Sequence, residues 1–397
     1  MKKIAFVVQR YGEEVTGGAE AECRMYAERL TDRFEVEALT TCAIDHLTWA
    51  DHYAPGVSTL NGVTVRRFPV PFPRNLPEFF KLSTPLMDGS DLSIPAQQRW
   101  LQAMGPNCPG LLDYIRDHSE EYAAVLFMTY LYPTALEGIQ LCKAPKLLIP
   151  TAHDEWALYL SSYRDLFEAA DGYIYNSEAE HRLVDSVFLE TCGKPTVTVG
   201  AGVQMPETAL PDVRERFGLT KPYLCYCGRI ESAKGCEDMF HFFSIYKRRF
   251  GGELDMVLTG QSAMVIPGRD DVHYLGFVSE EEKLAVMQGA VCLVQGSRFE
   301  SLSIVVLESL MMGTPVLVNG QCPVLRDHVR LSGAGLYYGS ADEFCGAVAW
   351  LQANPEKRAL MGANGREYVA KNYHWPELIE RLRGIIDEVS GGPSPEA

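Results

Sequence analysis

The stretch GSRFESLSIVVLESLMMGTPVLVN, residues 296–319, places two acidic residues within a mostly apolar run. The two residues are Glu300 and Glu308. A buried ionised carboxylate without a partner costs several kcal/mol, or its pKa shifts until the group becomes neutral. The two acids therefore need partners, and the chemistry of those partners indicates what the segment does.

The segment carries conflicting signals for its secondary structure. Its β-branched Ile-Val-Val run favours a strand when it is considered alone. The apolar runs on either side, residues 291–296 and 315–319, are typical of strands, and successive parallel strands need a crossover between them. We therefore predict a helix that Ser303 could cap, with Glu300 in the preceding loop and Glu308 about two turns into the helix.

Short apolar runs alternate with helical patterns along the whole chain. In the first half, strand-like runs such as residues 3–9 and 124–130 alternate with helical patterns such as residues 18–30 and 178–189. The second half repeats this rhythm from residue 223 onward. Strands that alternate with helices predict parallel sheets covered on both faces. Two such series predict an α/β protein with two doubly wound domains.

The first domain is expected to span residues 1–203 and the second residues 204–373, because residues 200–218 contain prolines beside acidic residues and no strand or long helix. A last helix is expected over residues 374–390, and a flexible tail over residues 391–397.

Residues 69–110 contain eight prolines and predict an irregular insertion in the first domain. Such an insertion is either a plain linker or a loop that packs or faces a ligand. Its cations Arg74 and Lys81 are either solvated charges or contacts for lipid phosphate.

Composition restricts the partners of the protein. The 36 Lys and Arg against 52 Asp and Glu give a net charge of −16, which argues against a nucleic-acid partner, because such a partner needs a basic stripe. It also disfavours general binding to an anionic membrane, although a local basic patch could still dock there. No apolar run reaches the ~18 residues of a membrane span. The first apolar run is too short for a signal peptide, and the eleven scattered cysteines suggest reduced thiols in a cytoplasm.

Ligands of doubly wound folds bind beyond the carboxyl ends of the strands. Gly17 and Gly18 lie there before the first helix, where they either admit an anion to its free amides or form a plain turn. Arg229 and Lys234 follow a later strand, and two cations five residues apart suit a diphosphate, with a solvated pair as the alternative. His153 also follows a strand and is either structural or ligand-facing.

The opening segment adds hydrogen-bonding groups of two kinds. Glu300 and Glu308 could accept hydrogen bonds from the hydroxyl groups of a polyol, and the free amides at the start of the helix could meet its phosphate. Together they would line one side of a cleft.

In order and spacing, several segments resemble glycosyltransferase family 4, a family of retaining enzymes with the two-domain GT-B fold. Glu300 and Glu308 are similar to its E-x7-E signature. The resemblance covers nearly the whole chain and is strongest from Tyr223 to Asn319. It rests on GG near the start, TAHDEW, YNSEAE, GRIESAKG, LTGQ, VHYLGFVSEEE, FESLSIVVLESLMMGTPVLV and the terminal YHWPELIERL.

The resemblance implies two Rossmann-like domains that face an interdomain cleft. The first would bind the acceptor and the second a nucleotide-diphosphate sugar, and the helix from Trp375 onward would cross back to the first domain. Gly17 and Gly18 would let the first domain close on the donor. His153 would lie beside the transferred sugar and the attacking hydroxyl.

In the second domain the resemblance implies a role for each polar residue. Arg229 and Lys234 would hold the donor diphosphate. Glu300 would contact the hydroxyls of the transferred sugar, and Glu308 would bind the ribose. The distal phosphate would meet the backbone amides of Leu302, Ser303 and Ile304.

The implied reaction is a retaining transfer of a sugar that needs no metal and no cofactor, and the chain contains no D-x-D motif of the kind that holds a divalent ion in other glycosyltransferases. The acceptor expected from the resemblance is a growing glycan or lipid-linked saccharide in cell-surface polysaccharide biosynthesis. The expected location is the cytoplasm, with weak peripheral contact at the inner face of the membrane.

The chain departs from the family pattern at three places. The family often has glycine where this chain has Ser303 and proline where it has Gly296, and its usual N-G-V-D near the domain junction is AGVQ here, residues 201–204. A serine amide can still bind phosphate.

Two other functions stay open. A GT-B sugar-nucleotide epimerase would release an altered sugar without an acceptor. A non-catalytic glycosyltransferase-like partner subunit would keep the fold without turnover. The presence of Arg229, Lys234 and both acids favours the transferase.

Overall fold

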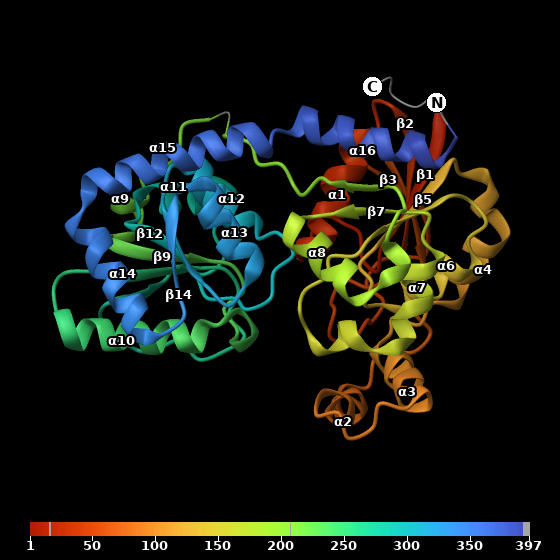
Figure 1. The fold of residues 1–397 in the computed structure, drawn as a ribbon, viewed down its shortest axis with the longest axis horizontal. Coiled ribbons are helices and arrows are strands. Elements are labelled where there is room, and N and C mark those ends of the chain that lie inside the picture. The colour runs from red at the N-terminus through yellow and green to blue at the C-terminus, as the bar shows by residue number, and fades with distance from the viewer. Residues whose placement is uncertain (16, 207, 392–397) are drawn as a thin grey trace. The chain divides into compact units, whose positions relative to one another are not determined.

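The computed structural model describes residues 1–391 except residues 16 and 207, so the predicted tail lies outside the described residues from residue 392 onward. The chain divides into two compact units, one formed by Met1–Ala201 with Pro376–Ala397 and the other by Gly202–Trp375 (Figure 1). The sequence predicted these divisions after residues 203 and 373. Gly202 instead packs closely against the ring of Trp375, and both residues belong to the second unit.

The described residues of the first unit form an eight-stranded sheet in the order β3-β4-β2-β1-β5-β6-β7-β8. Its strands pair in parallel, except that β3 pairs antiparallel with β4 at the edge. The sequence did not predict β3. The strands are β1 Lys2–Val7, β2 Phe34–Thr41, β3 Gly56–Leu60, β4 Val63–Phe68, β5 Ala124–Met128, β6 Lys146–Ile149, β7 Gly172–Tyr175 and β8 Thr196–Thr198.

Helices connect these strands, and the predicted helix at residues 18–30 is confirmed as α1. The helices of the first unit are α1 Gly18–Leu30, α2 Leu76–Met87, α3 Ile94–Met104, α4 Pro109–His118, α5 Pro133–Leu136, α6 Gly138–Leu141, α7 Arg164–Ala169 and α8 Glu178–Val187. Short 3₁₀ turns are η1 Ser119–Glu121, η2 Trp156–Tyr159, η3 Ser161–Tyr163 and η4 Leu189–Thr191.

The prediction of an irregular insertion at residues 69–110 is wrong, because this segment forms α2, α3 and the start of α4 (Figure 1). Pro77, Pro95 and Pro109 lie in the first turns of these helices, where proline's missing N–H has no intrahelical acceptor to lose. Trp100 of α3 donates to the Ser83 hydroxyl of α2 at 2.9 Å and joins the two helices.

Arg74, considered above as a contact for lipid phosphate, is engaged inside the first unit. Its Nε donates to the Met104 carbonyl at 2.6 Å, and its guanidinium lies 4.9 Å from the ring of Trp49. Burial lowers its pKa to about 10. Lys81 is exposed. Among the described residues, no helix combines the length and apolar character that crossing a bilayer requires.

The described residues of the second unit form a six-stranded parallel sheet in the order β11-β10-β9-β12-β13-β14. The strands are β9 Tyr223–Cys227, β10 Asp255–Thr259, β11 Val272–Tyr274, β12 Cys292–Gln295, β13 Val316–Asn319 and β14 Gly335–Tyr338. The helices are α9 Val213–Phe217, α10 Cys236–Phe250, α11 Glu280–Gly289, α12 Ile304–Met312, α13 Pro323–Ser332, α14 Ala341–Ala353, α15 Pro355–Asn372 and α16 Trp375–Val389, of which α16 continues into the first unit.

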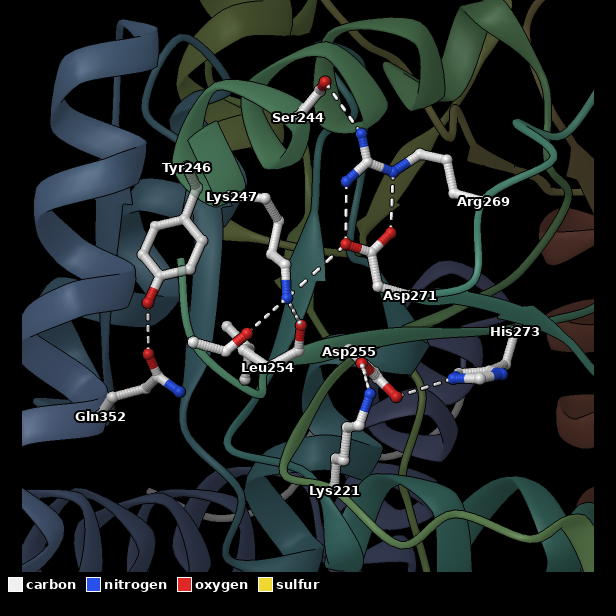
Figure 2. A network of polar contacts seen from close by, with 11 residues as sticks. Lys221, Ser244, Tyr246, Lys247, Leu254, Asp255, Arg269, Asp271, His273 and Gln352 are labelled. Carbon is white, nitrogen blue, oxygen red and sulfur yellow. Dashed lines mark hydrogen bonds and ion pairs between the residues drawn. The ribbon is translucent and has the colours of Figure 1, made fainter. Parts of the chain in front are cut away.

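A network of ion pairs fixes the amino ends of β10 and β11 (Figure 2). Asp255 at the start of β10 lies 2.8 Å from His273 of β11 and 3.7 Å from Lys221. Asp271, just before β11, accepts two hydrogen bonds from Arg269 at 2.7 and 2.8 Å. Because these charges have protein partners, the network stabilises the amino end of the sheet.

Burial raises the pKa of two glutamates in the core of the first unit, Glu22 and Glu180. Glu22 of α1 accepts a hydrogen bond from the Asn176 side chain at 3.0 Å. Glu180 of α8 accepts from the backbone amides of Ala152 at 2.5 Å and Asn176 at 2.6 Å. Burial raises the pKa of Glu22 to about 7 and that of Glu180 to about 8. The folded protein therefore favours the protonated form of both groups.

The pKa of Glu22 gives the first testable prediction. Burial raises the pKa of Glu22 from the usual 4.5 of an exposed glutamate to about 7 in the folded state. Between about pH 4.5 and pH 7 the folded protein therefore binds more protons than the unfolded protein does. The free energy of unfolding consequently falls as the pH rises through this range. Glu22→Gln removes this loss. Relative to wild type, we expect the variant to gain about 2 kcal/mol of unfolding free energy between about pH 5 and about pH 8, measured by urea denaturation.

The exposed Glu178 on α8 provides the matched control. Glu178→Gln should leave the pH dependence of the unfolding free energy unchanged. If the difference between Glu22→Gln and wild type stays constant with pH, the buried carboxyl does not titrate as described.

Candidate functional site

The carboxyl end of the second sheet carries loops that approach each other closely. Gly235 follows the loop after β9, and a Cβ atom there would overlap the carbonyl oxygen of Gly296, which follows β12. Gly260 follows β10, and a Cβ atom there would overlap the carbonyl of Gly228. Both Gly235 and Gly260 have positive φ angles, 72° and 122°. Glycine is therefore needed at both positions for backbone conformation and for space.

The predicted residues Lys234 and Glu300 are in direct contact. Lys234 ends the 3₁₀ turn η5, Ser232–Lys234, and its Nζ lies 2.8 Å from Glu300 Oε1 in the loop after β12. The Glu300 side chain is 12% exposed and the Lys234 side chain 27% exposed. Arg229 lies on the same loop as Lys234 and pairs with Glu231 at 3.3 Å.

Glu308 meets a lysine that the sequence analysis did not identify. Lys283 of α11 places its Nζ 2.9 Å from Glu308 Oε1, and it also lies 2.7 Å from Glu280. Burial raises the pKa of Glu308 to about 7, and the Lys283 charge opposes this rise. Burial also opposes the charge of Lys283, but the two carboxylates raise its pKa above the usual value. Lys283 therefore stays protonated, and its cation lies beside the carboxyl of Glu308.

The helix prediction for the central segment is confirmed by α12, which begins at Ile304 directly after Ser303. The prediction that Ser303 caps it is wrong. Ser303 adopts the left-handed conformation, with φ 70° and ψ 74°, and its side chain makes no capping hydrogen bond. Its buried hydroxyl has no partner among the described residues. The Ile304 and Val305 amides at the start of α12 consequently receive no side-chain cap, whereas the Val306 amide donates to the Ser303 carbonyl at 3.0 Å.

His328 of α13 holds the loop before α12 in place. Its Nε2 donates to the Leu302 carbonyl at 2.7 Å, and its Nδ1 accepts from the Tyr368 hydroxyl at 3.1 Å. Burial lowers its pKa, so the neutral ring donates with one nitrogen and accepts with the other. This contact fixes the backbone from which the Leu302, Ser303 and Ile304 amides project.

The predicted glycines of the first unit lie at the start of α1. Gly17 is its N-cap residue with φ 155°, and a Cβ atom there would overlap the carboxylate of Glu20. Glu20 in turn accepts from Arg10 Nε at 2.9 Å. Gly17 therefore makes room for a buried ion pair that the sequence analysis did not identify. The Cβ position of Gly18 has no atom within 4 Å.

His153 follows β6 and has an acidic partner. Its Nδ1 lies 3.1 Å from Glu155 Oε1, which also accepts from the Tyr130 hydroxyl at 2.9 Å. Burial opposes the charge of Glu155, yet the hydrogen bond with His153 holds its pKa below the usual range. The adjacent Ala152 amide is held by Glu180, so both sides of His153 are anchored.

The predicted site residues thus fall into two groups. Arg229, Lys234, Glu300, Glu308 and the backbone of residues 302–304 lie at the carboxyl end of the second sheet. Gly17, Gly18 and His153 follow β1 and β6 of the first unit. Across residues 1–391 other than 16 and 207, no group of three or more His, Cys, Asp or Glu side chains is arranged to hold a metal ion.

Comparison with known families finds a match within the second unit. Residues 212–368 match the family described as Glycosyl transferases group 1. Alpha-D-kanosaminyltransferase of Streptomyces kanamyceticus is 29% identical over 200 residues, which cover 46% of this chain and 50% of that protein. A GDP-mannose-dependent alpha-(1-6)-phosphatidylinositol monomannoside mannosyltransferase of Mycobacterium tuberculosis is 26% identical over 196 residues, covering 45% and 51%. The chain thus spans about half the length of the curated relatives it matches.

Solved structures resemble the chain over nearly its full length. Sucrose-phosphate synthase from Thermosynechococcus elongatus has a TM-score of 0.73 at 18% identity, with 98% of this chain and 100% of that chain covered. The Anabaena protein HepE, solved in complex with UDP-glucose, has a TM-score of 0.68 at 15% identity, with coverage of 98% and 100%. The protein therefore has the GT-B fold of two Rossmann-like α/β units, as predicted. Its second unit is similar to group 1 glycosyltransferases.

The left-handed Ser303 gives a stability prediction. A non-glycine residue in this conformation is strained, and its buried hydroxyl lacks a partner among the described residues. We expect Ser303→Gly to raise the free energy of unfolding by about 1 kcal/mol, measured by urea denaturation.

Ser340 provides the opposite case, because it caps α14 in an extended conformation through a hydrogen bond from the Glu343 amide at 3.2 Å. Ser340→Gly should lose a few tenths of a kcal/mol. A loss of stability in Ser303→Gly would mean that the conformation at residue 303 is not strained.

Proposed function

We propose that the protein is a retaining glycosyltransferase that moves a sugar from a nucleotide-diphosphate sugar to a hydroxyl of a glycan or lipid-linked saccharide. The observation that carries the proposal is the contact of Lys234 with Glu300 beside the uncapped start of α12. This arrangement offers a cation, a carboxylate and free amides at the carboxyl end of a parallel sheet. The similarity to group 1 glycosyltransferases and the UDP-sugar complexes of structural neighbours support it.

The donor diphosphate would take Lys234 as a partner in place of Glu300. Arg229 would add a forked pair of donors, and the amides of Leu302, Ser303 and Ile304 would bind the distal phosphate. Glu300, once separated from Lys234, would accept hydrogen bonds from hydroxyls of the transferred sugar. Glu308 would bind the two ribose hydroxyls, and Lys283 would hold its carboxyl in the orientation that they need.

The reaction follows from where charge develops. The bond between the sugar C1 and the phosphate oxygen breaks, and its electron pair stays on the nucleotide diphosphate. The sugar becomes oxocarbenium-like, and the acceptor oxygen forms a bond to C1 on the face that the diphosphate leaves. The acceptor proton passes to the departing phosphate oxygen. Arg229, Lys234 and the α12 amides stabilise the charge that accumulates there, which is the largest electrostatic contribution expected.

His153 would lie beside the sugar and the attacking hydroxyl. Its hydrogen bond with Glu155 through Nδ1 orients the ring. We place the reaction in the cytoplasm, within cell-surface polysaccharide biosynthesis, with weak peripheral contact at the inner membrane face. The donor would be turned over without a metal ion or cofactor, because the cations of the protein bind the leaving group.

A panel of nucleotide sugars tests the donor and the metal requirement together. We expect one donor to bind and to be slowly hydrolysed to the nucleoside diphosphate and free sugar, at a rate that EDTA leaves unchanged, followed by NMR. A strict requirement for manganese would contradict the charge assignment. Release of an altered sugar without an acceptor would indicate an epimerase, and donor binding without turnover a non-catalytic subunit.

Two substitutions separate donor binding from transfer. Glu308→Ala removes the ribose contact and should chiefly weaken donor binding, by about tenfold or more. Lys234→Ala removes a charge that acts on the leaving group and should chiefly lower the rate, by about a hundredfold. The exposed Lys357 on α15 provides a control, Lys357→Ala, that should change neither. Unchanged kinetics in both site variants would refute the assignment.

A further inference from the structure

The loop between β12 and α12, residues 296–303, carries Glu300 and is held near both ends by side chains from later segments. Toward its far end, His328 of α13 donates to the Leu302 carbonyl at 2.7 Å. At its near end, Asn319 of β13 donates through Nδ2 to the Gly296 carbonyl at 3.0 Å. Glu300 therefore lies between two fixed points of the backbone.

Asn319 continues a hydrogen-bonded ladder that the backbone leaves incomplete. The parallel pairing of β12 with β13 ends at Gln295 and Val318, so the Gly296 carbonyl lies one residue beyond it. A buried carbonyl without a donor is unfavourable. The Asn319 side chain, which is buried, supplies the donor and extends the pairing by one bond.

The orientation of the Asn319 amide is set at both of its ends. Its Oδ1 accepts a hydrogen bond from the Gln321 amide at 3.0 Å, while its Nδ2 donates to the Gly296 carbonyl. A reversed side-chain amide would place its oxygen against the Gly296 carbonyl and its NH₂ group against the Gln321 N–H, and both contacts would be repulsive. These contacts favour a role for Asn319 in holding the loop.

The residue that Asn319 holds is a glycine for reasons of space. A Cβ atom at Gly296 would lie 2.9 Å from the Gly235 carbonyl oxygen, and Gly235 directly follows Lys234. Glycine permits this close approach, but it also gives the backbone more conformational freedom than any other residue does. The hydrogen bond from Asn319 to the Gly296 carbonyl restricts that freedom at the point where the loop begins.

The restriction passes along the loop to Glu300. Ser297 is buried, and its hydroxyl donates to the Phe299 carbonyl at 3.0 Å, which closes a local turn. Glu300 follows this turn, and its Oε1 lies 2.8 Å from Lys234 Nζ. A displacement of Gly296 would consequently move the turn and, with it, the backbone of Glu300.

We propose that Asn319 is a positioning residue that fixes Glu300 in contact with Lys234. This effect on the contact between the two side chains does not depend on the proposed function. Its consequence for the substrate does rest on the proposed function: by placing Glu300, Asn319 determines how well that carboxylate accepts hydrogen bonds from the transferred sugar.

A double-mutant cycle tests the effect on the contact. The free energies of unfolding of Lys234→Ala, Glu300→Ala and the double variant, measured by urea denaturation, give the coupling between the two side chains. We expect favourable coupling in the wild-type background and about half of it or less in the Asn319→Asp background. Asn319→Asp keeps the shape of the side chain but places an oxygen against the Gly296 carbonyl. Asn319→Ala gives the same comparison if Asn319→Asp does not fold.

Equal coupling in both backgrounds, or no coupling in the wild-type background, would overturn the proposal. Asn354 provides the matched control, because its Nδ2 donates to the Trp350 carbonyl at 2.8 Å in an exposed place. Asn354→Asp loses a hydrogen bond of the same kind and should leave the coupling of Lys234 with Glu300 unchanged. An equal loss of coupling in Asn354→Asp would indicate a general loosening of the unit and would also overturn the proposal.

Nucleotide binding separates a positioning role from a merely structural one. The probes are UDP and GDP, each compared with its nucleotide sugar, UDP-glucose or GDP-mannose. We expect Asn319→Asp to weaken the nucleotide sugar that binds by about fivefold and its nucleoside diphosphate by less than about twofold, because Glu300 would contact only the sugar. In the Glu300→Ala background, Asn319→Asp should have no further effect on either ligand. Equal weakening of both ligands would indicate a structural role and overturn the proposal.

These measurements distinguish failure of the proposal from failure of the proposed function. If none of the four nucleotides binds, the proposed donor site is wrong, and the double-mutant cycle alone decides the role of Asn319. If Glu300→Ala weakens the nucleotide sugar but Asn319→Asp does not, the donor site stands and the positioning role is rejected.

Discussion

The pairing of two largely buried carboxylates with two lysines determines the geometry at the carboxyl end of the second sheet. Glu300 meets Lys234 from the loop after β9, and Glu308 meets Lys283 from α11. Removing Lys283 would leave the buried Glu308 carboxyl without its cation, and the loss of one partner of a buried ion pair costs about 3–5 kcal/mol in typical proteins. Each pair therefore joins the segment at residues 296–312 to a different neighbour. This answers the question raised by two acids in an apolar run, because the partners are cations from segments distant in sequence.

The ion pairs depend in turn on how closely the backbone segments approach. Lys234 reaches Glu300 because Gly235 lies against the carbonyl of Gly296, with no room for a side chain between them. At residue 303 the chain must also enter α12 in a left-handed conformation, and here it does so with serine instead of glycine. His328 compensates by fixing the preceding carbonyl. The left-handed conformation of Ser303 thus accounts for the free amides at the start of α12, because the Ser303 side chain forms no capping hydrogen bond there.

The sequence predicted what depends on local pattern and missed what depends on distant contacts. The α/β alternation predicted both sheets, and the need for a crossover correctly favoured a helix over a strand at residues 304–306. The edge strand β3 was missed, although Asn61-Gly62 is a sequence typical of a two-residue hairpin turn. In the structure both residues have the positive φ angles of such a turn. Prolines were interpreted as breakers in residues 69–110, where several begin helices instead. Lys283 and His328 gave no local signal, because each acts on a residue about 25 positions away.

The two lysine–carboxylate pairs differ in a way that matters for the proposed chemistry. Lys283 is held between two carboxylates, Glu280 and Glu308, and a ligand would have to displace both to remove it. Lys234 has one carboxylate partner and a more exposed side chain, so an incoming diphosphate can compete for it in a water-accessible place. Exchange of that partner would free the Glu300 carboxylate when the diphosphate binds. Binding of the diphosphate to Lys234 would then neutralise part of the phosphate charge and free Glu300 to contact the sugar. The pair of Glu308 and Lys283, which would face the ribose, would stay unchanged.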